Sequence, residues 1–303
     1  MKRLPIMMII GVSLLAVGCG TPSSGSLGPA PTTTAGASSP ASPPASGTAS
    51  ATASPSGQRP TATPAPAREI GVQAWFSRNG KLFVTQRTVP ATAGVGRGAL
   101  DRVLTGPSAA ENAAGLRTQI PADTTLRGLR ISAGIATADL SSSFESAASP
   151  SAMPLRIAQV VYTLTQFPTV TGVRFAINGE AKTVVGGVPV QSPQTRAMYG
   201  GYLPAITVQS PVIGAQVANP VAVSGTADVF EATVSVRILN SAGHEIARTF
   251  TNASCGTGCR GVYSVTIPYS VPRTQPGTIV VFESSAKDGQ PVNVQQIPVT
   301  LAP

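Results

Sequence analysis

The sequence is poor in the residues from which catalytic and metal sites are most often built. Among 303 residues there are one histidine and three cysteines, and charged residues make up only 11% of the chain. A metal site with four protein ligands is therefore hard to assemble. His244-Glu245 begins the zinc motif H-E-x-x-H, but Arg248 stands where the second histidine is needed, which excludes a zincin. We expect no metal and no cofactor.

Other catalytic motifs are missing as well. The sequence contains no G-x-S-x-G and no P-loop. The glycines of 94–98 do not complete G-x-G-x-x-G because Ala99 interrupts it, and we interpret them as a loop before a helix. A Ser-His-Asp set would have to use His244, which we expect at an exposed turn. We expect no enzymatic activity and interpret three carboxylates as caps, turn residues or solvated groups: Glu111, Asp123 and Asp139.

Aromatic residues are scarce, at 5% of the chain, although the formal net charge is +9. Lys2, Arg3 and Arg59 precede residue 68, and the chain from there on carries 18 basic and 12 acidic side chains. These basic residues form no stripe and are not interleaved with aromatic ones, as nucleic-acid binding would require. We therefore expect no nucleic-acid partner, and interpret the charge as a mildly basic surface that faces an anionic envelope.

The segment 20–67 has no acidic residue, no aromatic residue, one basic residue and one large aliphatic residue, Leu27. Such a composition cannot bury enough apolar surface to offset the entropy of ordering the chain. The rest of the segment is mainly Ser, Thr, Pro, Ala and Gly. We predict a disordered tether over residues 19–67 and folded material from residue 68 onward, enough for two domains.

The first nineteen residues have the pattern of an export signal. A short basic start at Lys2-Arg3 precedes an apolar stretch over 4–17, which is too short to span a bilayer comfortably. It ends in Leu15-Ala16-Val17-Gly18-Cys19, which resembles a bacterial lipobox, with Ala16 where Leu is most usual. The resemblance implies a signal peptide over 1–18, cleavage before Cys19 and acylation of its thiol. Several acyl chains would anchor the protein to the membrane, on its extracytoplasmic face.

The other two cysteines, Cys255 and Cys259, lie in NASCGTGCRG, where two glycines allow a tight loop. In an exported protein such a pair persists as a disulfide. A metal site would need more ligands, and a redox motif would have the spacing C-x-x-C beside a helix. We therefore predict a local structural disulfide, which adds little to global stability because it closes a very short loop.

Residues 68–186 mix strand and helix signals. Asn79-Gly80 between two β-rich runs predicts a hairpin, and a second Asn-Gly in GVRFAINGEAKTV predicts another. Apolar residues at helical spacing precede Gly106-Pro107, and Ser108-x-x-Glu111 has the pattern of a capping box. TLRGLRIS and GIATADLS alternate like paired strands. The stretch 154–167 favours a helix, with a strand as the alternative. We predict an α+β domain with a mainly antiparallel sheet.

Four motifs of this region occur in a familiar order: LTGPSAAENAAGLRTQIP, ATADLSSSF, AQVVYTLTQFP and GVRFAINGE. Together they resemble the GerM N-terminal (GerMN) domain of sporulation and spore-germination lipoproteins. The resemblance implies an assembly module that binds protein partners, and related lipoproteins partner a sensor kinase at the membrane. It implies no catalytic residues.

After an expected linker at 187–202, residues 203–303 carry strand signals every eight to twelve residues and no helical pattern. Seven such segments, from ITVQSP to VNVQQIPV, predict an immunoglobulin-like β-sandwich. We expect turns at Asn240–Gly243 and at Pro276-Gly277. The run ITVQSPVIGAQVANPVAVSGTADVFEATVSVRI resembles the immunoglobulin-like module that follows GerM-type domains in spore-germination lipoproteins.

These observations predict a membrane-anchored extracytoplasmic lipoprotein that acts as a non-enzymatic interaction module of the cell envelope. The partners expected are the membrane, through lipidated Cys19, an envelope protein, and a second copy of the chain. The alternative is a binder of cell-wall glycan or of an anionic envelope polymer through the basic first domain. Salt-sensitive retention on isolated wall would favour that alternative, because screening weakens electrostatic binding.

Overall fold

The computed structural model describes residues 68–146, 149 and 152–303. The expected signal peptide, Cys19 and the tether therefore lie outside the described residues. Within the described part, no helix is long and apolar enough to cross a membrane. The fold class predicted from the sequence is confirmed: an α+β region is followed by an all-β immunoglobulin-like sandwich.

The chain begins with the expected hairpin, β1 (Glu69–Arg78) and β2 (Lys81–Pro90), paired in antiparallel register. Both turn residues have positive φ, 52° at Asn79 and 72° at Gly80, as the predicted type of turn requires. Helix α1 (Val95–Thr105) follows and stops at Gly106. It starts earlier than the sequence suggests, so Gly96 and Gly98 lie in the helix and not in a loop before it. A Cβ on Gly98 would lie 3.2 Å from Cβ of Val89, so glycine lets α1 pack closely on β2.

A four-stranded sheet has the strand order β3-β4-β5-β6. Its strands are β3 (Leu126–Ser132), β4 (Ile135–Leu140), β5 (Gly172–Ile177) and β6 (Glu180–Ala181). The β3–β4 and β5–β6 hairpins are antiparallel as expected, but β4 and β5 run parallel. A parallel pair needs a long crossover, which here contains the 3₁₀ turn η1 (Ser142–Glu145) and helix α3 (Ala152–Leu164).

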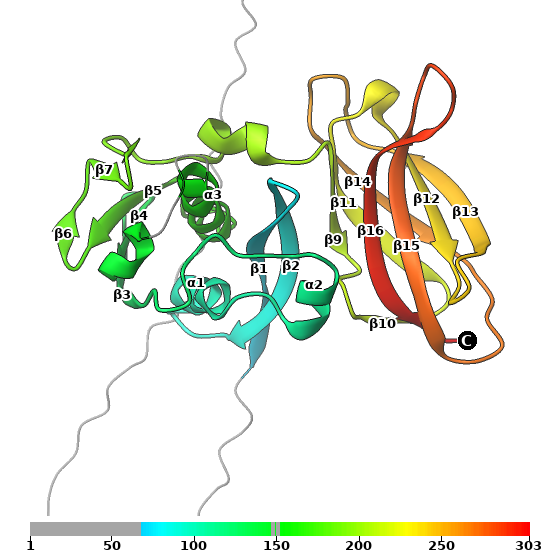
Figure 1. Ribbon diagram of the computed structural model, residues 1–303, viewed down its shortest axis with the longest axis horizontal. Helices are drawn as coiled ribbons and strands as arrows, with labels where there is room; N and C mark the ends of the chain where they lie inside the picture. The colour runs from blue at the N-terminus through cyan, green and yellow to red at the C-terminus, as the bar shows by residue number, and fades with distance from the viewer. Residues whose placement is uncertain (1–67, 147–148, 150–151) are drawn as a thin grey trace, which may run out of the picture. The chain divides into compact units, whose positions relative to one another are not determined.

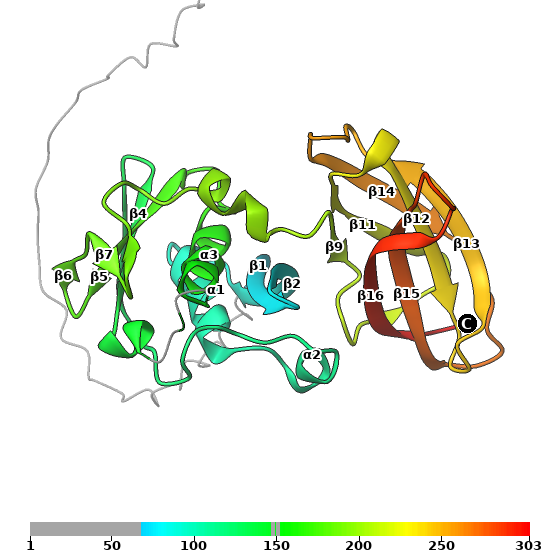
Figure 2. The ribbon, with the colours of Figure 1, turned by 45° about the horizontal axis from the view of Figure 1, so that its top comes forward.

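Helix α3 is buried along almost its whole length, and the alternative strand assignment for this stretch is wrong. Figures 1 and 2 show why: α1 and α3 form a middle layer between the β1–β2 hairpin and the four-stranded sheet. A helix covered on both sides carries apolar residues all round, which weakens the helical period and explains why the sequence leaves a strand as the alternative. The core of this region is built from such side chains, including Leu100, Ile157, Val161 and Phe175.

The segment after β6 packs against α3. It contains β7 (Val184–Val185), β8 (Val188–Pro189) and the 3₁₀ helix η2 (Arg196–Tyr202). The Arg196 guanidinium lies 4.7 Å from the ring centroid of Tyr162 and 5.6 Å from that of Trp75. Its Nη2 donates to the carbonyl of Tyr162 at 2.8 Å. The expected linker 187–202 thus contains a short strand and a 3₁₀ helix, and Arg196 attaches it to α3.

The second region consists of two sheets packed face to face, as Figure 2 shows. One sheet has the order β14-β11-β9 and the other β10-β16-β15-β12-β13. All seven expected strands are present, together with a two-residue β10 and the 3₁₀ turn η3 (Phe230–Ala232). The strands are β9 (Ile206–Ser210), β10 (Gln216–Val217), β11 (Val221–Ala227), β12 (Thr233–Leu239), β13 (Glu245–Asn252), β14 (Gly261–Ile267), β15 (Gln275–Ser284) and β16 (Pro291–Leu301).

The turn expected at Pro276-Gly277 is wrong, because both residues lie inside β15 and pair with β16. Glycine is needed at position 277 because neighbouring atoms leave no room for a side chain, and not because the chain turns there. A Cβ on Gly277 would lie 2.5 Å from Cδ1 of Leu301 and 2.8 Å from the carbonyl oxygen of Leu239. The other expected turn is confirmed: the amide of Gly243, at φ 79°, donates to the carbonyl of Asn240.

Candidate interaction surface

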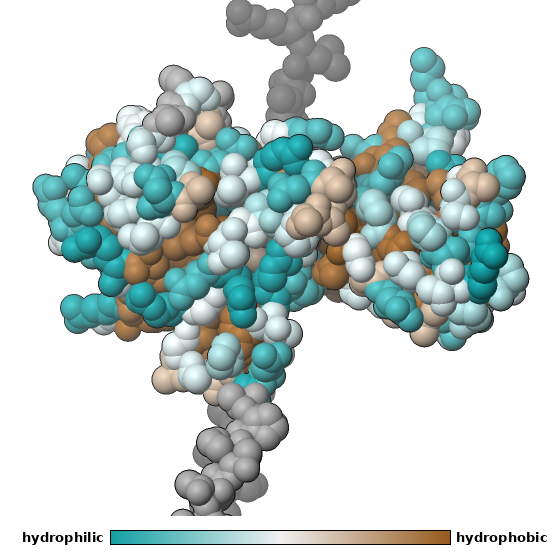
Figure 3. All heavy atoms as spheres, turned by 60° about the horizontal axis from the view of Figure 1, so that its bottom comes forward, coloured by the Kyte–Doolittle hydropathy of each residue, from teal (hydrophilic) through white to brown (hydrophobic). Residues whose placement is uncertain are grey.

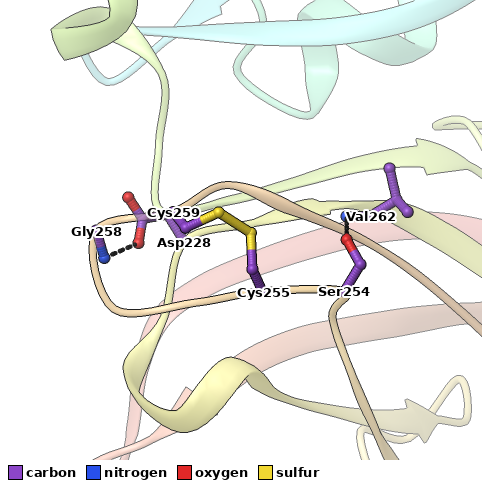
Figure 4. Close-up of a disulfide and its surroundings, with 6 residues drawn as sticks. All are labelled: Asp228, Ser254, Cys255, Gly258, Cys259 and Val262. Carbon is purple, nitrogen blue, oxygen red and sulfur yellow. Dashed lines mark hydrogen bonds between the residues drawn. A yellow bond between two sulfur atoms is a disulfide. The ribbon is translucent and has the colours of Figure 1, made fainter. Parts of the chain in front are cut away.

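The structure joins Cys255 and Cys259 in a disulfide with 5.6 Å between the two Cα atoms, shown in Figure 4. The loop is held at several points besides the sulfur bridge. The amide of Gly258 donates to Oδ1 of Asp228 at 2.8 Å, and the amide of Val262 donates to Oγ of Ser254 at 3.0 Å. The disulfide thus closes a loop that is already tied to its surroundings, as a structural cross-link does.

The carboxylates considered from the sequence are not brought together. Asp139 accepts a hydrogen bond from the amide of Gly179 at 2.9 Å, and Asp123 lies in an exposed turn. His244 is exposed in the turn before β13. Across residues 68–146, 149 and 152–303, no three potential His, Cys, Asp or Glu ligands lie close enough to hold a metal ion.

Glu111 has the predicted capping role and a second role that the sequence does not reveal. As the capping box requires, its Oε2 accepts from the amide of Ser108, at the start of α2 (Ala109–Ala113), and its own amide donates to Oγ of Ser108. The buried carboxylate also accepts from Oγ1 of Thr85 at 2.6 Å and from both terminal nitrogens of Arg87. Burial alone would raise the pKa of Glu111, but these hydrogen bonds outweigh burial and lower it. The cluster joins α2 to β2 and is structural.

Exposed large apolar side chains occur on both folded regions, and the most exposed of them lies on the sandwich. On the face shown in Figure 3, apolar residues lie in separate patches among hydrophilic ones. Phe250 on β13 is the most exposed of the large apolar side chains in the described part of the chain, at 67%. It lines an open hollow of about 640 Å³ together with Thr233, Ser235, Arg248 and Thr249. We call these five residues the β13 surface.

The arginines beside Phe250 are held in place by the fold. Phe282 on β15 lies under them, 5.3 Å from the guanidinium carbon of Arg237 and 5.8 Å from that of Arg248, and is only 1% exposed. Glu245 accepts two hydrogen bonds from Arg248, at 2.7 and 2.8 Å. Because Arg248 donates to it, the pKa of Glu245 is lowered. The β13 surface therefore presents a hydrogen-bonded guanidinium beside an exposed aromatic ring.

Strand β13 is the last strand of its sheet and pairs only with β12. An exposed aromatic side chain on a terminal strand is typical of a surface that binds another chain. The sequence predicts the strand but not this surface. The mixed polar and apolar residues of EIARTF predict that β13 has one exposed face. The position of β13 at the sheet edge depends on strand order, which no local pattern encodes.

A second exposed feature lies on the four-stranded sheet. Arg130 on β3 and Arg174 on β5 flank Thr137 of β4 in register, so the three side chains share one face. The neighbouring Ala136 and Ala138 are fully buried, which places the arginines on the face away from the helices. Both arginines are exposed, and neither forms an ion pair with an acidic residue of the described chain. This face can attract an anion.

Comparisons with known proteins identify both folded regions. Residues 75–183 match the sequence model of the family described as "Sporulation and spore germination" (Germane). Residues 205–290 match that of the "Immunoglobulin-like domain of bacterial spore germination" (Gmad2). A search among curated proteins finds no match.

Similar solved structures include domains of one sporulation protein. The first GerMN domain of the sporulation protein GerM from Bacillus subtilis is 25% identical, with a TM-score of 0.37, over 42% of this chain and 98% of that chain. The tandem GerMN domains of the same protein are 17% identical, with a TM-score of 0.38, over 78% of this chain and 61% of that one.

Proposed function

Since the chain joins a GerMN domain to the immunoglobulin-like domain of bacterial spore germination, we propose that it is a membrane-anchored, non-enzymatic protein-interaction module of the cell envelope. Its process would be sporulation or germination, with a sensor kinase as one kind of partner. Neither matched family is described as an enzyme. Cys19 would carry the lipid anchor, and the tether 19–67 would hold the folded regions away from the bilayer.

The observation that carries the proposal is the β13 surface. A binding surface needs side chains that gain from losing water and that are already ordered before the partner arrives. Phe250 supplies the first property, since most of its ring is in contact with solvent. Arg248 supports the second, because its guanidinium is hydrogen-bonded to Glu245 and lies 5.8 Å from the ring centroid of Phe282. Aromatic and arginine side chains of this kind are enriched at the centres of protein interfaces.

The test compares proteins recovered with the acylated full chain from native membranes and with its Phe250→Asp variant. Phe250 is exposed, so this substitution leaves the fold intact. Val262→Asp on β14 is the matched control, because Val262 is 65% exposed and lies outside the β13 surface. We expect one envelope protein to be recovered with the wild type and with Val262→Asp but not with Phe250→Asp. Equal recovery by all three proteins would contradict the role of the β13 surface.

The anchor has its own test, a Cys19→Ala variant followed by membrane fractionation. The wild type is expected in the membrane fraction, because two or more acyl chains anchor a protein stably. The variant lacks the acylated thiol and is expected to leave that fraction. A variant that stays in the membrane fraction as fully as the wild type would contradict lipid anchoring at Cys19.

A second candidate function, binding of an anionic wall polymer, is favoured by Arg130 and Arg174. Two exposed guanidiniums lie on one face of the sheet, one on each side of β4, where together they can attract an anionic chain. Retention of the full chain on isolated cell wall should then fall with added salt. The double variant Arg130→Ala/Arg174→Ala should lose most of this retention. Retention that does not respond to salt or to these substitutions would exclude this second function.

A further inference from the structure

The direction of the free backbone groups of β13 can be determined from one hydrogen bond. The amide of Ala253 donates to the carbonyl of Ala232, which extends the register of β13 on β12 by one residue. Residues directly opposite each other alternate between hydrogen-bonded and non-hydrogen-bonded pairs along an antiparallel ladder. Ala253 therefore belongs to the set whose backbone groups point toward β12. The alternate residues Arg248, Phe250 and Asn252 point their amides and carbonyls away from β12, toward the open edge.

The edge of β13 lacks the features that usually block pairing. Glu245–Asn252 contains no proline and no lysine, and its only register irregularity lies at its first residues. The edge strand β3 of the first region also contains no proline and no lysine. Each strand carries two charged residues, but the Leu126 carbonyl of β3 already accepts a hydrogen bond from Arg97 at 2.9 Å. β13 lies beside β14, where Oγ1 of Thr251 donates to the carbonyl of Ser264 at 3.4 Å, but in the described chain its backbone forms a ladder with β12 alone.

The sequence of β13 is complementary to itself in antiparallel pairing. When two copies pair around Thr249, Arg248 of each lies directly opposite Phe250 of the other. Both belong to the set with outward-pointing backbone groups, so this register satisfies the alternation and forms about four backbone hydrogen bonds. Opposite side chains lie on the same face, so each guanidinium meets the aromatic ring of the other copy and the dimer contains two such contacts. Glu245 already neutralises Arg248 within each copy, which limits repulsion between the two arginines.

We propose that two copies of this chain pair through the edges of their β13 strands, antiparallel and centred on Thr249. The proposal rests on the β13 surface being an interaction site, and it names a second copy as the occupant. A single edge contact is small, so pairing is weak for free molecules and is promoted when acylated chains share one membrane. Each copy uses the same β13 edge, so the interface is symmetric and the pairing ends at a closed dimer.

A cysteine at position 249 tests the register directly. Pairing around Thr249 places the two copies of this residue in a non-hydrogen-bonded pair with Cα atoms about 4.5 Å apart, within the range that a disulfide spans. The full-length Thr249→Cys variant is displayed in its native membranes, oxidised, and analysed by non-reducing gel electrophoresis. We expect a covalent dimer that forms on the order of ten times faster than with Val262→Cys, whose more exposed side chain reports random collision. Adding Phe250→Asp to Thr249→Cys should return the rate to that of the control.

Two outcomes would overturn the pairing. One is equal dimer formation by Thr249→Cys and Val262→Cys. The other is a Thr249→Cys dimer that Phe250→Asp does not slow. If the pairing fails while Phe250→Asp still loses an envelope partner in the membrane recovery experiment, the surface serves a different protein, and the proposed function stands without self-association. If both experiments fail, the β13 surface is not an interaction site.

Discussion

Replacing Glu111 by glutamine tests the internal support of the first region. Oε1 of Glu111 accepts from Thr85 and Arg87, and Oε2 accepts from Arg87 and the amide of Ser108. Glutamine has nearly the same shape, but whichever oxygen becomes the amide nitrogen, two of these donors lose their acceptor. The substitution also leaves the Arg87 guanidinium, which is 20% exposed, without its counter-charge.

The expected loss in the free energy of unfolding follows from these lost hydrogen bonds and the lost counter-charge. A hydrogen bond to a charged group contributes about 1.5–3 kcal/mol, and breaking a buried ion pair from one side costs about 3–5 kcal/mol. Because Arg87 keeps some contact with water, we place the loss at the lower end, about 3 kcal/mol. For a region of this size that corresponds to a fall in Tm on the order of 10 °C. Asp101→Asn, which alters an exposed pair with Arg97 at 3.9 Å, should change the stability by less than about 0.5 kcal/mol.

The assay uses the fluorescence of Trp75, the only tryptophan in the sequence. Trp75 is buried in the first region, so its emission follows the unfolding of that region in urea. The pKa of folded Glu111 is lowered, so its contribution is complete above the unfolded value of about 4.3. This contribution of Glu111 is lost as the pH falls through the lower folded pKa. The difference in free energy of unfolding between wild type and variant should therefore shrink in that range. A gap below about 0.5 kcal/mol at neutral pH would refute the stabilising role of the cluster.

Two further predictions concern the sandwich. Gly277→Ala should destabilise it by about 1–3 kcal/mol in thermal unfolding, because the new methyl group would meet Leu301 and a backbone oxygen; a change within about 0.5 kcal/mol would show that β15 shifts freely there. Replacing Cys255 and Cys259 together by serine should cost at most about 2 kcal/mol, since the loop entropy removed by so short a cross-link is small. Failure of that variant to fold would contradict a merely local role for the disulfide.

Features that depend on neighbouring residues alone were predictable from the sequence. Asn79-Gly80 and Asn178-Gly179 form turns because both residues of each pair adopt positive φ. The capping box of Ser108 and Glu111 depends on a spacing of three residues along the chain. In each case the determining contacts lie within a few residues, so the pattern and the structure agree.

Features that depend on distant partners were not predictable. The parallel β4–β5 pair follows from the path of the crossover, which no local pattern encodes. Gly277 has the composition of a turn but serves a close approach of Leu301, which lies 24 positions later in the sequence. The β13 surface likewise combines side chains of β12 and β13 with Phe282 of β15 beneath them, and only the strand order brings them together.

The most direct measurement of the central claim is site-specific photocrosslinking in intact membranes. A photoreactive phenylalanine analogue at position 250 of the acylated full chain reports what lies on the β13 surface, and the same analogue at position 262 reports the background. We expect a discrete crosslinked protein at position 250 and none at position 262. A crosslinking pattern at position 250 that matches the one at position 262 would contradict the claim that this surface binds a protein.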